Sequence, residues 1–356
     1  MSRAKRHHQV PRFYLAIFAD PKGRVRVVDR SVGKAFNVPP TNVAVEANLY
    51  TTRDEDGAPS DVAERALASF EGVVAERLPL LLEPRPSISE RDRWVIAQFV
   101  ALQHIRTARF RDFLADAFDL RNRFATEANV AGDSPEMVER FIRKRYPEAS
   151  EELQHQVREV AADPSRAFRL SNDDWLAQSF PLVPDVAELL IARHWWLVDA
   201  DERAFLTCDD PVALVADPRI PGMGVGFRTA ALVMLPLSPY RTLVMEGKNT
   251  GALSISSATR GLIKEINRRV ASGATRQIYH HPRSNPLEGI QLESGGVIAH
   301  VNGVPVGRGE RSYDKIRDQF IPRAHELRDE IRATREGRGG DAVAAERYRD
   351  GATVKG

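Results

Sequence analysis

The chain has 356 residues, a formal net charge of +2 and one cysteine, Cys208. This length suits one large domain or two modest ones, and 42% hydrophobic with 28% charged residues is the composition of a packed globular protein. The charge balance excludes a polycation, and the lone cysteine excludes an internal disulfide framework.

The N-terminal segment predicts a short helix and no export signal. Residues Met1–Gln9 are basic, but Pro11 and Arg12 interrupt the apolar stretch that follows. No signal peptide or membrane span fits there, so we expect a cytoplasmic protein that does not enter a membrane. Pro11 suits the first turn of a helix that ends near Phe18.

The next part of the chain is mainly helical. A turn at Asp20–Gly23 precedes a strand at Val25–Val28. Apolar residues at helical spacing, with Ser60 and Ser89 as caps, then predict a run of helices. The expected helices cover residues 60–82, 89–118, 133–146, 150–162 and 183–193.

The second half of the chain has the pattern of β-hairpins. The expected strands are Trp195–Asp199, Ala204–Thr207, Ala230–Leu237, Thr242–Glu246 and Arg276–Tyr279, with a helix over 257–271. A charged helix is expected at Tyr313–Glu336. The Gly-rich polar segment Gly337–Gly356 predicts a disordered tail.

These elements predict an α+β fold in which one mainly antiparallel sheet is packed by a large helical layer, because hairpins without regular βαβ alternation favour antiparallel pairing. We expect a main domain at residues 1–282 with a helical insertion at about 60–193. A C-terminal extension with a helix follows at 283–336, and a disordered tail at 337–356.

Several fragments resemble a bacterial family, in the order in which they occur. They are His7–Leu15 with Phe18, Val27–Arg30, Glu46 with Asn48–Tyr50, Gln103 with Arg106–Thr107, Phe205–Pro211, Leu235–Pro239 and Asn267. Over residues 7–281 the chain resembles domain-of-unknown-function family 4238. That family opens on a His-x-x-Pro-x-Tyr-Leu motif and carries a Thr-Ser-Asp-Asn-Pro motif, where this chain has Thr-Cys-Asp-Asp-Pro. The resemblance implies no particular activity.

Two pairs of titratable residues are candidates for catalysis. His7 and His8 offer imidazoles that titrate near neutral pH, and Asp209 and Asp210 follow an expected strand. Together they can activate water or hold a divalent metal ion, although their spacing matches no metal signature. The alternatives are that the histidines belong to a flexible basic tail and that the aspartates cap a turn.

Gln103 and Arg106 are candidates for binding an anion. Both lie on the apolar stripe of the helix expected over 89–118. A buried guanidinium needs a carboxylate or an anionic ligand, because an unpaired buried charge costs several kcal/mol. Glu46, Asp209 or Asp210 are the expected partners in an internal bridge from helix to sheet, and a bound phosphate is the alternative.

Two segments are rich in basic residues, around residues 106–123 and 140–145. Such runs can follow a phosphate backbone. Aspartates interleave with the first run and glutamates with the second. We therefore interpret both as solvated faces stabilised by salt bridges.

The sequence lacks the glycine-rich nucleotide signatures and the Gly-x-Ser-x-Gly nucleophile motif. The leading hypothesis is a hydrolase acting on a phosphate-containing substrate, of the nuclease or phosphodiesterase type. In it His7 or His8 is the acid or base, the two aspartates supply carboxylates, and Gln103 with Arg106 and Glu46 bind the anion. The alternative is a non-catalytic module that binds nucleic acid or a protein. A toxin or phage-defence role fits either hypothesis.

Overall fold

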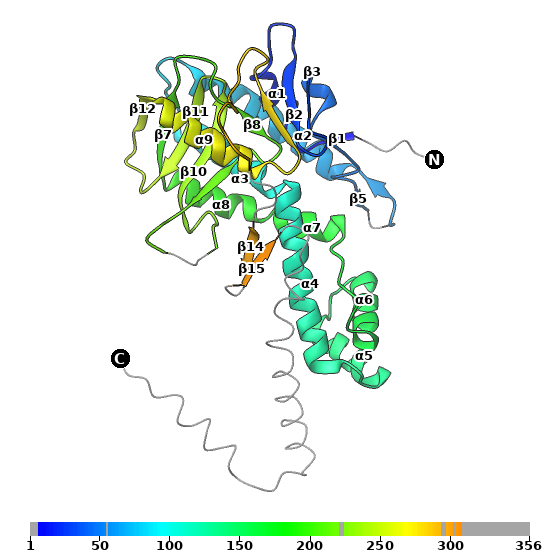
Figure 1. Cartoon of the computed structure of the whole chain (residues 1–356). Coiled ribbons are helices and arrows are strands. Elements are labelled where there is room, and N and C mark those ends of the chain that lie inside the picture. The colour runs from blue at the N-terminus through cyan, green and yellow to red at the C-terminus, as the bar shows by residue number, and fades with distance from the viewer. Residues whose placement is uncertain (1–5, 55, 221–223, 293–296, 302–303, 308–356) are drawn as a thin grey trace, which may run out of the picture. The chain divides into compact units, whose positions relative to one another are not determined.

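The computed structural model describes residues 6–54, 56–220, 224–292, 297–301 and 304–307. The chain divides into two compact units, one made of residues 1–115 and 170–309, the other of 116–169 and 310–356. The labelled elements can be followed in Figure 1. The predicted helix at 313–336 and the predicted tail lie outside the described residues.

The helices of the first unit are α1 (Arg12–Ala16), α2 (Val62–Arg77), α3 (Glu90–Ile105), α7 (Asn172–Ser179), α8 (Leu182–Ile191) and α9 (Arg260–Gly273), with short 3-10 helices at Pro40–Asn42 and Leu78–Leu82. Helix α4 (Ala108–Val130) continues into the second unit, which contains α5 (Pro135–Arg145) and α6 (Glu151–Ala162). None of the helices in the described part is both long and apolar enough to cross a bilayer.

The described strands are β1 (Arg6–His8), β2 (Val25–Asp29), β3 (Lys34–Val38), β4 (Val45–Ala47), β5 (Thr52–Arg53), β6 (Pro59–Ser60), β7 (His194–Asp199), β8 (Thr207–Cys208), β9 (Ala213–Ala216), β10 (Ala230–Ser238), β11 (Arg241–Glu246), β12 (Leu253–Ser257), β13 (Gln277–His280), β14 (Val297–Val301) and β15 (Val304–Gly307). Three pairs form small two-stranded sheets: β1 with β4, β5 with β6, and β14 with β15.

Two larger sheets organise the remaining strands. One has the order β12-β7-β11-β10-β9 and the other β3-β2-β13-β8, and of these pairings β12 with β7 is parallel. The predicted class, α+β with mainly antiparallel sheets, is confirmed, but the prediction of a single sheet is wrong. Hairpin spacing predicts that neighbouring strands pair, yet β8 pairs with the distant β13 instead of with β7.

The side chains of β7 point alternately to the two faces of the five-stranded sheet, and different helices cover each face. Trp195 and Leu197 of β7 join the core that α3 and α8 cover. Trp196 and Val198 join the core on the side of α9 (Figure 1). The two-residue period of a strand produces this division. The sheet is therefore buried on both faces, and α3 is fixed against it.

The helix expected over 89–118 breaks at Arg106, which ends α3 with a ψ of 2°. The cause is Thr107, because its hydroxyl donates to the carbonyl of His104 at 2.8 Å and accepts the N–H of Phe110 at 3.2 Å. A threonine that bonds the backbone locally competes with the helical hydrogen bonds and caps the next helix. The break leaves Arg106 at the junction between α3 and α4.

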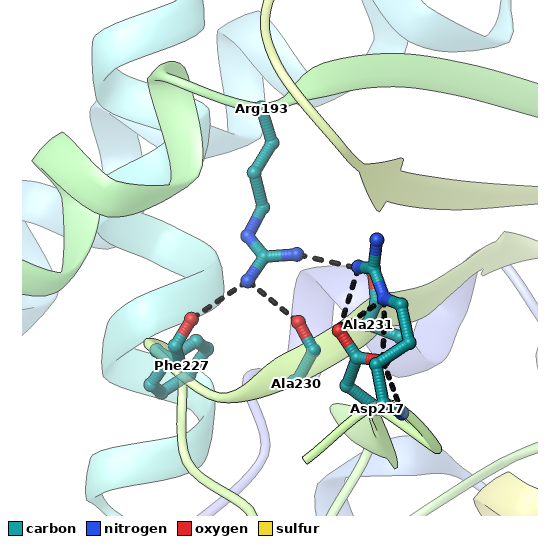
Figure 2. Close-up of polar contacts among 6 residues, drawn as sticks. Arg193, Asp217, Phe227, Ala230 and Ala231 are labelled. Carbon is teal, nitrogen blue, oxygen red and sulfur yellow. Dashed lines mark hydrogen bonds and ion pairs between the residues drawn. The ribbon is translucent and has the colours of Figure 1, made fainter.

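Arg193 ties three elements of the first unit together, just after the end of α8. Its Nη2 donates to the carbonyls of Phe227 and Ala230, both at 2.8 Å, and its Nη1 donates to the carbonyl of Ala231 at 3.2 Å. Figure 2 shows this side chain reaching the start of β10. Its own carbonyl accepts from Arg93 Nη2 of α3 at 2.9 Å. These bonds fix the position of α3.

The second unit, residues 116–169 in its described part, is a small helical hairpin with its own core. Val138 and Ile142 of α5 are buried, and so is Val157 of α6. Its buried polar contact lies on α4, where Arg123 Nη1 is 3.4 Å from Asp119 Oδ2. This internal pair satisfies a guanidinium that burial would otherwise destabilise.

Candidate functional site

His7 is fixed in place through its Nδ1. It lies on β1, directly opposite Glu46 of β4. Its Nδ1 accepts the backbone N–H of Tyr50 at 2.7 Å, and its Nε2 lies 3.2 Å from Glu64 Oε2. Because Nδ1 is an acceptor, the ring proton sits on Nε2 and faces the carboxylate. His7 therefore positions the turn that carries Tyr50.

The Tyr50 hydroxyl lies at the centre of a buried polar cluster. It donates to the carbonyl of His8 at 3.3 Å. Burial raises the pKa of Tyr50 to about 12, while the charge of Arg106 lowers it and the charges of Glu71 and Glu46 raise it. Three charged side chains from different elements thus act on one hydroxyl. We call His7, His8, Glu46, Tyr50, Glu71, Gln103 and Arg106 the motif cluster.

The internal partner of Arg106 is Glu71 of α2. Arg106 Nη1 lies 2.7 Å from Glu71 Oε1, and the Arg106 side chain is fully buried while that of Glu71 is 24% exposed. The three expected partners, Glu46, Asp209 and Asp210, form no ion pair with Arg106 in the described part of the chain. The bridge therefore joins helix to helix and not helix to sheet, which corrects the sequence prediction.

The Arg106 guanidinium is buried, and besides Glu71 it interacts with the Tyr50 hydroxyl, whose pKa it lowers. Its Nε and Nη2 make no hydrogen bond of good geometry to the described residues. The same holds for both amide atoms of Gln103, which lies one turn earlier on α3 and is 1% exposed. Buried polar atoms without partners are costly and uncommon in folded proteins. This pair is therefore the feature of the cluster that points to a ligand.

Glu46 lies at the solvent side of the motif cluster. Its Oε1 is 2.8 Å from Arg111 Nη1, and its Oε2 accepts from Arg111 Nη2 at 3.1 Å. Gln9 donates to the same carboxylate at 2.5 Å. The Arg111 guanidinium also lies over the ring of Trp175, 5.7 Å from its centroid. Glu46 is thus already neutralised, so its role is to hold Arg111 and not to contact an anion.

His8 is the second histidine of the motif cluster. It is half-buried, and its Nδ1 is buried without a hydrogen bond of good geometry. Burial lowers the pKa of His8 below its ordinary value of 6.5, and the positive charge of Arg12 lowers it further, while a hydrogen bond to the backbone of Val43 and the charge of Glu71 oppose the shift. The imidazole is therefore neutral near pH 7, which is the form that accepts a proton.

The lowered pKa of His8 predicts a dependence of stability on pH. Since the folded pKa lies below the unfolded one, the unfolded chain binds more protons, and stability falls as pH decreases through 6.5. His8→Gln is expected to reduce this loss. A proton NMR titration should place the His8 imidazole below 6.5. A midpoint above that value would contradict the argument.

Asp209 has a structural role at the end of β8. Its Oδ1 accepts the N–H of Thr275 at 2.8 Å, and its Oδ2 accepts those of Arg276 at 2.7 Å and Gln277 at 2.9 Å. Burial raises the pKa of the Asp209 carboxyl, and the three N–H groups act in the opposite direction. Both oxygens are occupied in starting β13, so this carboxylate is not free to activate water.

Asp210 faces a different histidine from the one expected. Its Oδ1 is buried and lies 3.7 Å from His104 Nδ1, beyond hydrogen-bond distance. No ion pair or hydrogen bond of the described residues joins either aspartate to His7 or His8. The geometry therefore separates the candidate aspartates from the candidate histidines.

Neither a reactive thiol nor a metal-binding cluster is found in the described part of the chain. Burial raises the pKa of the Cys208 thiol well above its usual range, and the neighbouring aspartates raise it further. Its Sγ donates to the carbonyls of Asp210 and Val270. In the described part of the chain no three His, Cys, Asp or Glu side chains gather in a way that could hold a metal ion.

Comparison with known proteins places the chain in a family. The sequence model of the family described as a protein of unknown function, DUF4238, matches residues 6–284. The chain belongs to the DUF4238 family. This confirms the resemblance predicted over residues 7–281. No curated protein and no solved structure matches the chain. The family description names no activity.

Two residues of the site escaped the sequence reasoning, Glu64 and Glu71. Both lie on α2, where they alternate with the buried Leu67 and Val74 in steps of three and four residues. This spacing places all four on one face of a helix. Two acidic residues on an apolar stripe could have predicted these partners, because a carboxylate on a packed helix face requires a counter-charge.

Proposed function

We propose that the chain hydrolyses a phosphate-containing substrate at the motif cluster, as a nuclease or phosphodiesterase does. The Nε–Nη2 edge of Arg106 carries this proposal. Nε and Nη2 form two parallel donors that match the spacing of phosphate or carboxylate oxygens. Arg241 uses the same edge on Asp199, with Nη2 2.6 Å from Oδ2. In Arg106 that edge is buried beside the unpaired amide of Gln103.

In the proposed reaction Arg106 and Gln103 hold the two non-bridging phosphate oxygens. Neutral His8 accepts a proton from water, and the water oxygen forms a bond to phosphorus while the bond to the leaving oxygen breaks. The protonated His8 then returns its proton to the leaving oxygen. Arg106 also stabilises the negative charge of the transition state. Relative to the sequence hypothesis, His8 keeps the role of acid or base, and the proposed reaction uses no carboxylate of Asp209 or Asp210.

Replacing Gln103 with methionine separates binding from folding. The change removes an unpaired buried amide and keeps the side-chain volume, so we expect stability to stay equal or rise by up to ~1 kcal/mol. Gln156→Met is the matched control. Gln156 is equally part of a helix but is fully paired with the backbone of Arg169, so its loss should cost ~1–3 kcal/mol. Thermal unfolding measures both.

Phosphate binding gives the direct test. About 10 mM inorganic phosphate, compared with chloride at equal ionic strength, should raise the Tm of the wild type by mass action. Gln103→Met should lose most of this shift although it remains folded. Cleavage of bis(p-nitrophenyl) phosphate should then fall in Gln103→Met and in His8→Gln. A wild type without a phosphate shift and without cleavage would refute the proposal.

A non-catalytic binding module is the second candidate, and the anchoring of His7 favours it. Nδ1 of His7 and both oxygens of Asp209 accept backbone N–H groups. Several side chains that the sequence suggested for chemistry thus help to hold the fold. A phosphate shift that depends on Gln103, without any cleavage of phosphodiesters, would select this candidate, a module that binds phosphate groups.

A further inference from the structure

The end of α5 presents a group of exposed basic side chains. Arg140, Arg143, Lys144 and Arg145 are exposed, and so is Arg121 on α4. The Tyr146 hydroxyl, directly after Arg145, donates to Asn122 Oδ1 of α4 at 3.0 Å, so the end of α5 lies against the part of α4 that carries Arg121. We call these five residues the basic patch. None of them forms an ion pair with a residue in the described part of the second unit.

The two glutamates of α5 that lie among these basic residues, Glu136 and Glu139, interact with other partners. Glu139 binds Arg158 of α6 through two hydrogen bonds, at 2.6 Å and 3.2 Å, although the charge of Arg143 also reaches it. Glu136 interacts with Ser134 at the start of α5, which lowers its pKa. The sequence predicted a face neutralised by salt bridges. The face is solvated as predicted, but among the described residues the cations of the basic patch form no salt bridge, because Glu139 pairs with Arg158 and Glu136 lies at the start of α5.

The helix dipole explains only part of this clustering. Cations in the last turn of a helix are favourable by a modest amount that salt screens. Arg121 lies on another helix and gains nothing from the C-terminus of α5, yet the Tyr146–Asn122 hydrogen bond brings its part of α4 against the end of α5. Several cations from two helices gathered at the end of α5 create a local positive potential on a chain of nearly balanced charge, and such a potential attracts a polyanion.

We propose that the basic patch binds the phosphate backbone of a nucleic-acid strand. This rests on the proposed function, since it makes the phosphate-containing substrate a nucleic acid. An anionic membrane is the less suitable partner. Stable membrane binding adds an apolar anchor to a polybasic segment, whereas Val138 and Ile142 are buried, and the exposed large hydrophobic residues of the described second unit are only Phe124 and Met137. Backbone phosphates need only the charges.

The test uses the full chain and a fluorescent single-stranded oligonucleotide of mixed sequence, about 20 nucleotides long. Fluorescence anisotropy over a range of salt concentrations gives the affinity and its salt slope. For Arg143→Gln with Lys144→Gln we expect an affinity about tenfold weaker near 0.1 M salt. The slope of log K against log salt should become shallower by ~1.4, since two phosphate contacts are lost. Both residues are exposed, so the fold should be kept.

The matched control is Arg268→Gln with Arg269→Gln in the first unit. It changes the net charge equally, but both arginines are paired with Glu265, so affinity should change less than ~2-fold. An equal loss in both double variants would show a general effect of net charge and would overturn the proposal. So would an unchanged patch variant, or binding to phosphatidylserine vesicles with none to the oligonucleotide.

The test of the basic patch can fail or succeed independently of the test of the motif cluster. Gln103→Met should keep the salt slope of oligonucleotide binding while it loses the phosphate shift. Patch-dependent oligonucleotide binding by a chain that neither responds to phosphate nor cleaves phosphodiesters would keep this inference and remove the proposed function. Phosphodiester cleavage without patch-dependent binding would remove this inference alone.

Discussion

Arg106→Leu is expected to lower the free energy of unfolding by about 3 kcal/mol, because it leaves the Glu71 carboxylate without its partner. This lies at the lower end of the range for breaking a buried ion pair, since the Glu71 side chain is 24% exposed and keeps some contact with water. For a unit of this size the loss corresponds to a decrease in Tm of roughly 6–12 °C. Urea unfolding of the two proteins measures it.

A double-mutant cycle isolates the pair. Arg106→Leu combined with Glu71→Leu should recover much of the stability, because two apolar side chains need no partner, and the coupling energy should reach about 1–3 kcal/mol. Arg65→Leu is the control, since Arg65 and Asp61 form an exposed pair on the same helix α2. That change should stay within about 0.5 kcal/mol. A loss for Arg106→Leu as small as the control would mean that the Glu71 bridge contributes nothing.

Asp209→Ala is expected to cost about 3 kcal/mol, because three backbone N–H groups at the start of β13 lose their acceptor. β13 pairs with both β2 and β8, so the loss should reach the whole four-stranded sheet. Hydrogen exchange should show faster exchange at Ile278 and Tyr279, whose strand this carboxylate begins. Chemical unfolding gives the energy.

Asp163→Ala provides the contrast for Asp209. Asp163 also accepts backbone and hydroxyl hydrogens, from Ser165, but on an exposed turn of the second unit, so its loss should stay near 0.5 kcal/mol. A stable Asp209→Ala variant that lost phosphodiester cleavage would reverse the assignment and make Asp209 catalytic. A destabilised variant whose folded fraction keeps its activity would establish the structural role.

Local patterns in the sequence determined most of the elements. Ser89 begins α3 and forms a capping box with Asp92, which a cap followed by an apolar stripe predicts. The alternation of Trp195 and Trp196 determined which of them enters each core. These features are predictable because they depend on residues within one or two turns of each other.

Sheet membership and the break of the long helix were decided by competition between local and distant contacts. Thr107 was a recognisable cap, yet the apolar stripe continued past it and favoured one helix. Likewise β8 had a plausible neighbour in β7 but pairs with β13. Nothing within a hairpin specifies which of two sheets it joins, because that depends on packing between segments far apart in the chain.

By itself the sequence determined that Arg106 needs an opposite charge and that Gln103 shares its face. Only the tertiary structure decided that Glu71 supplies this charge, that His8 and Glu46 lie in the same cluster, and that Asp209 holds β13 instead. The physical reason is the distance along the chain over which each feature is determined. Burial of a charge follows from the period of a single helix, but the identity of its partner depends on how helices and strands pack, which no local spacing encodes.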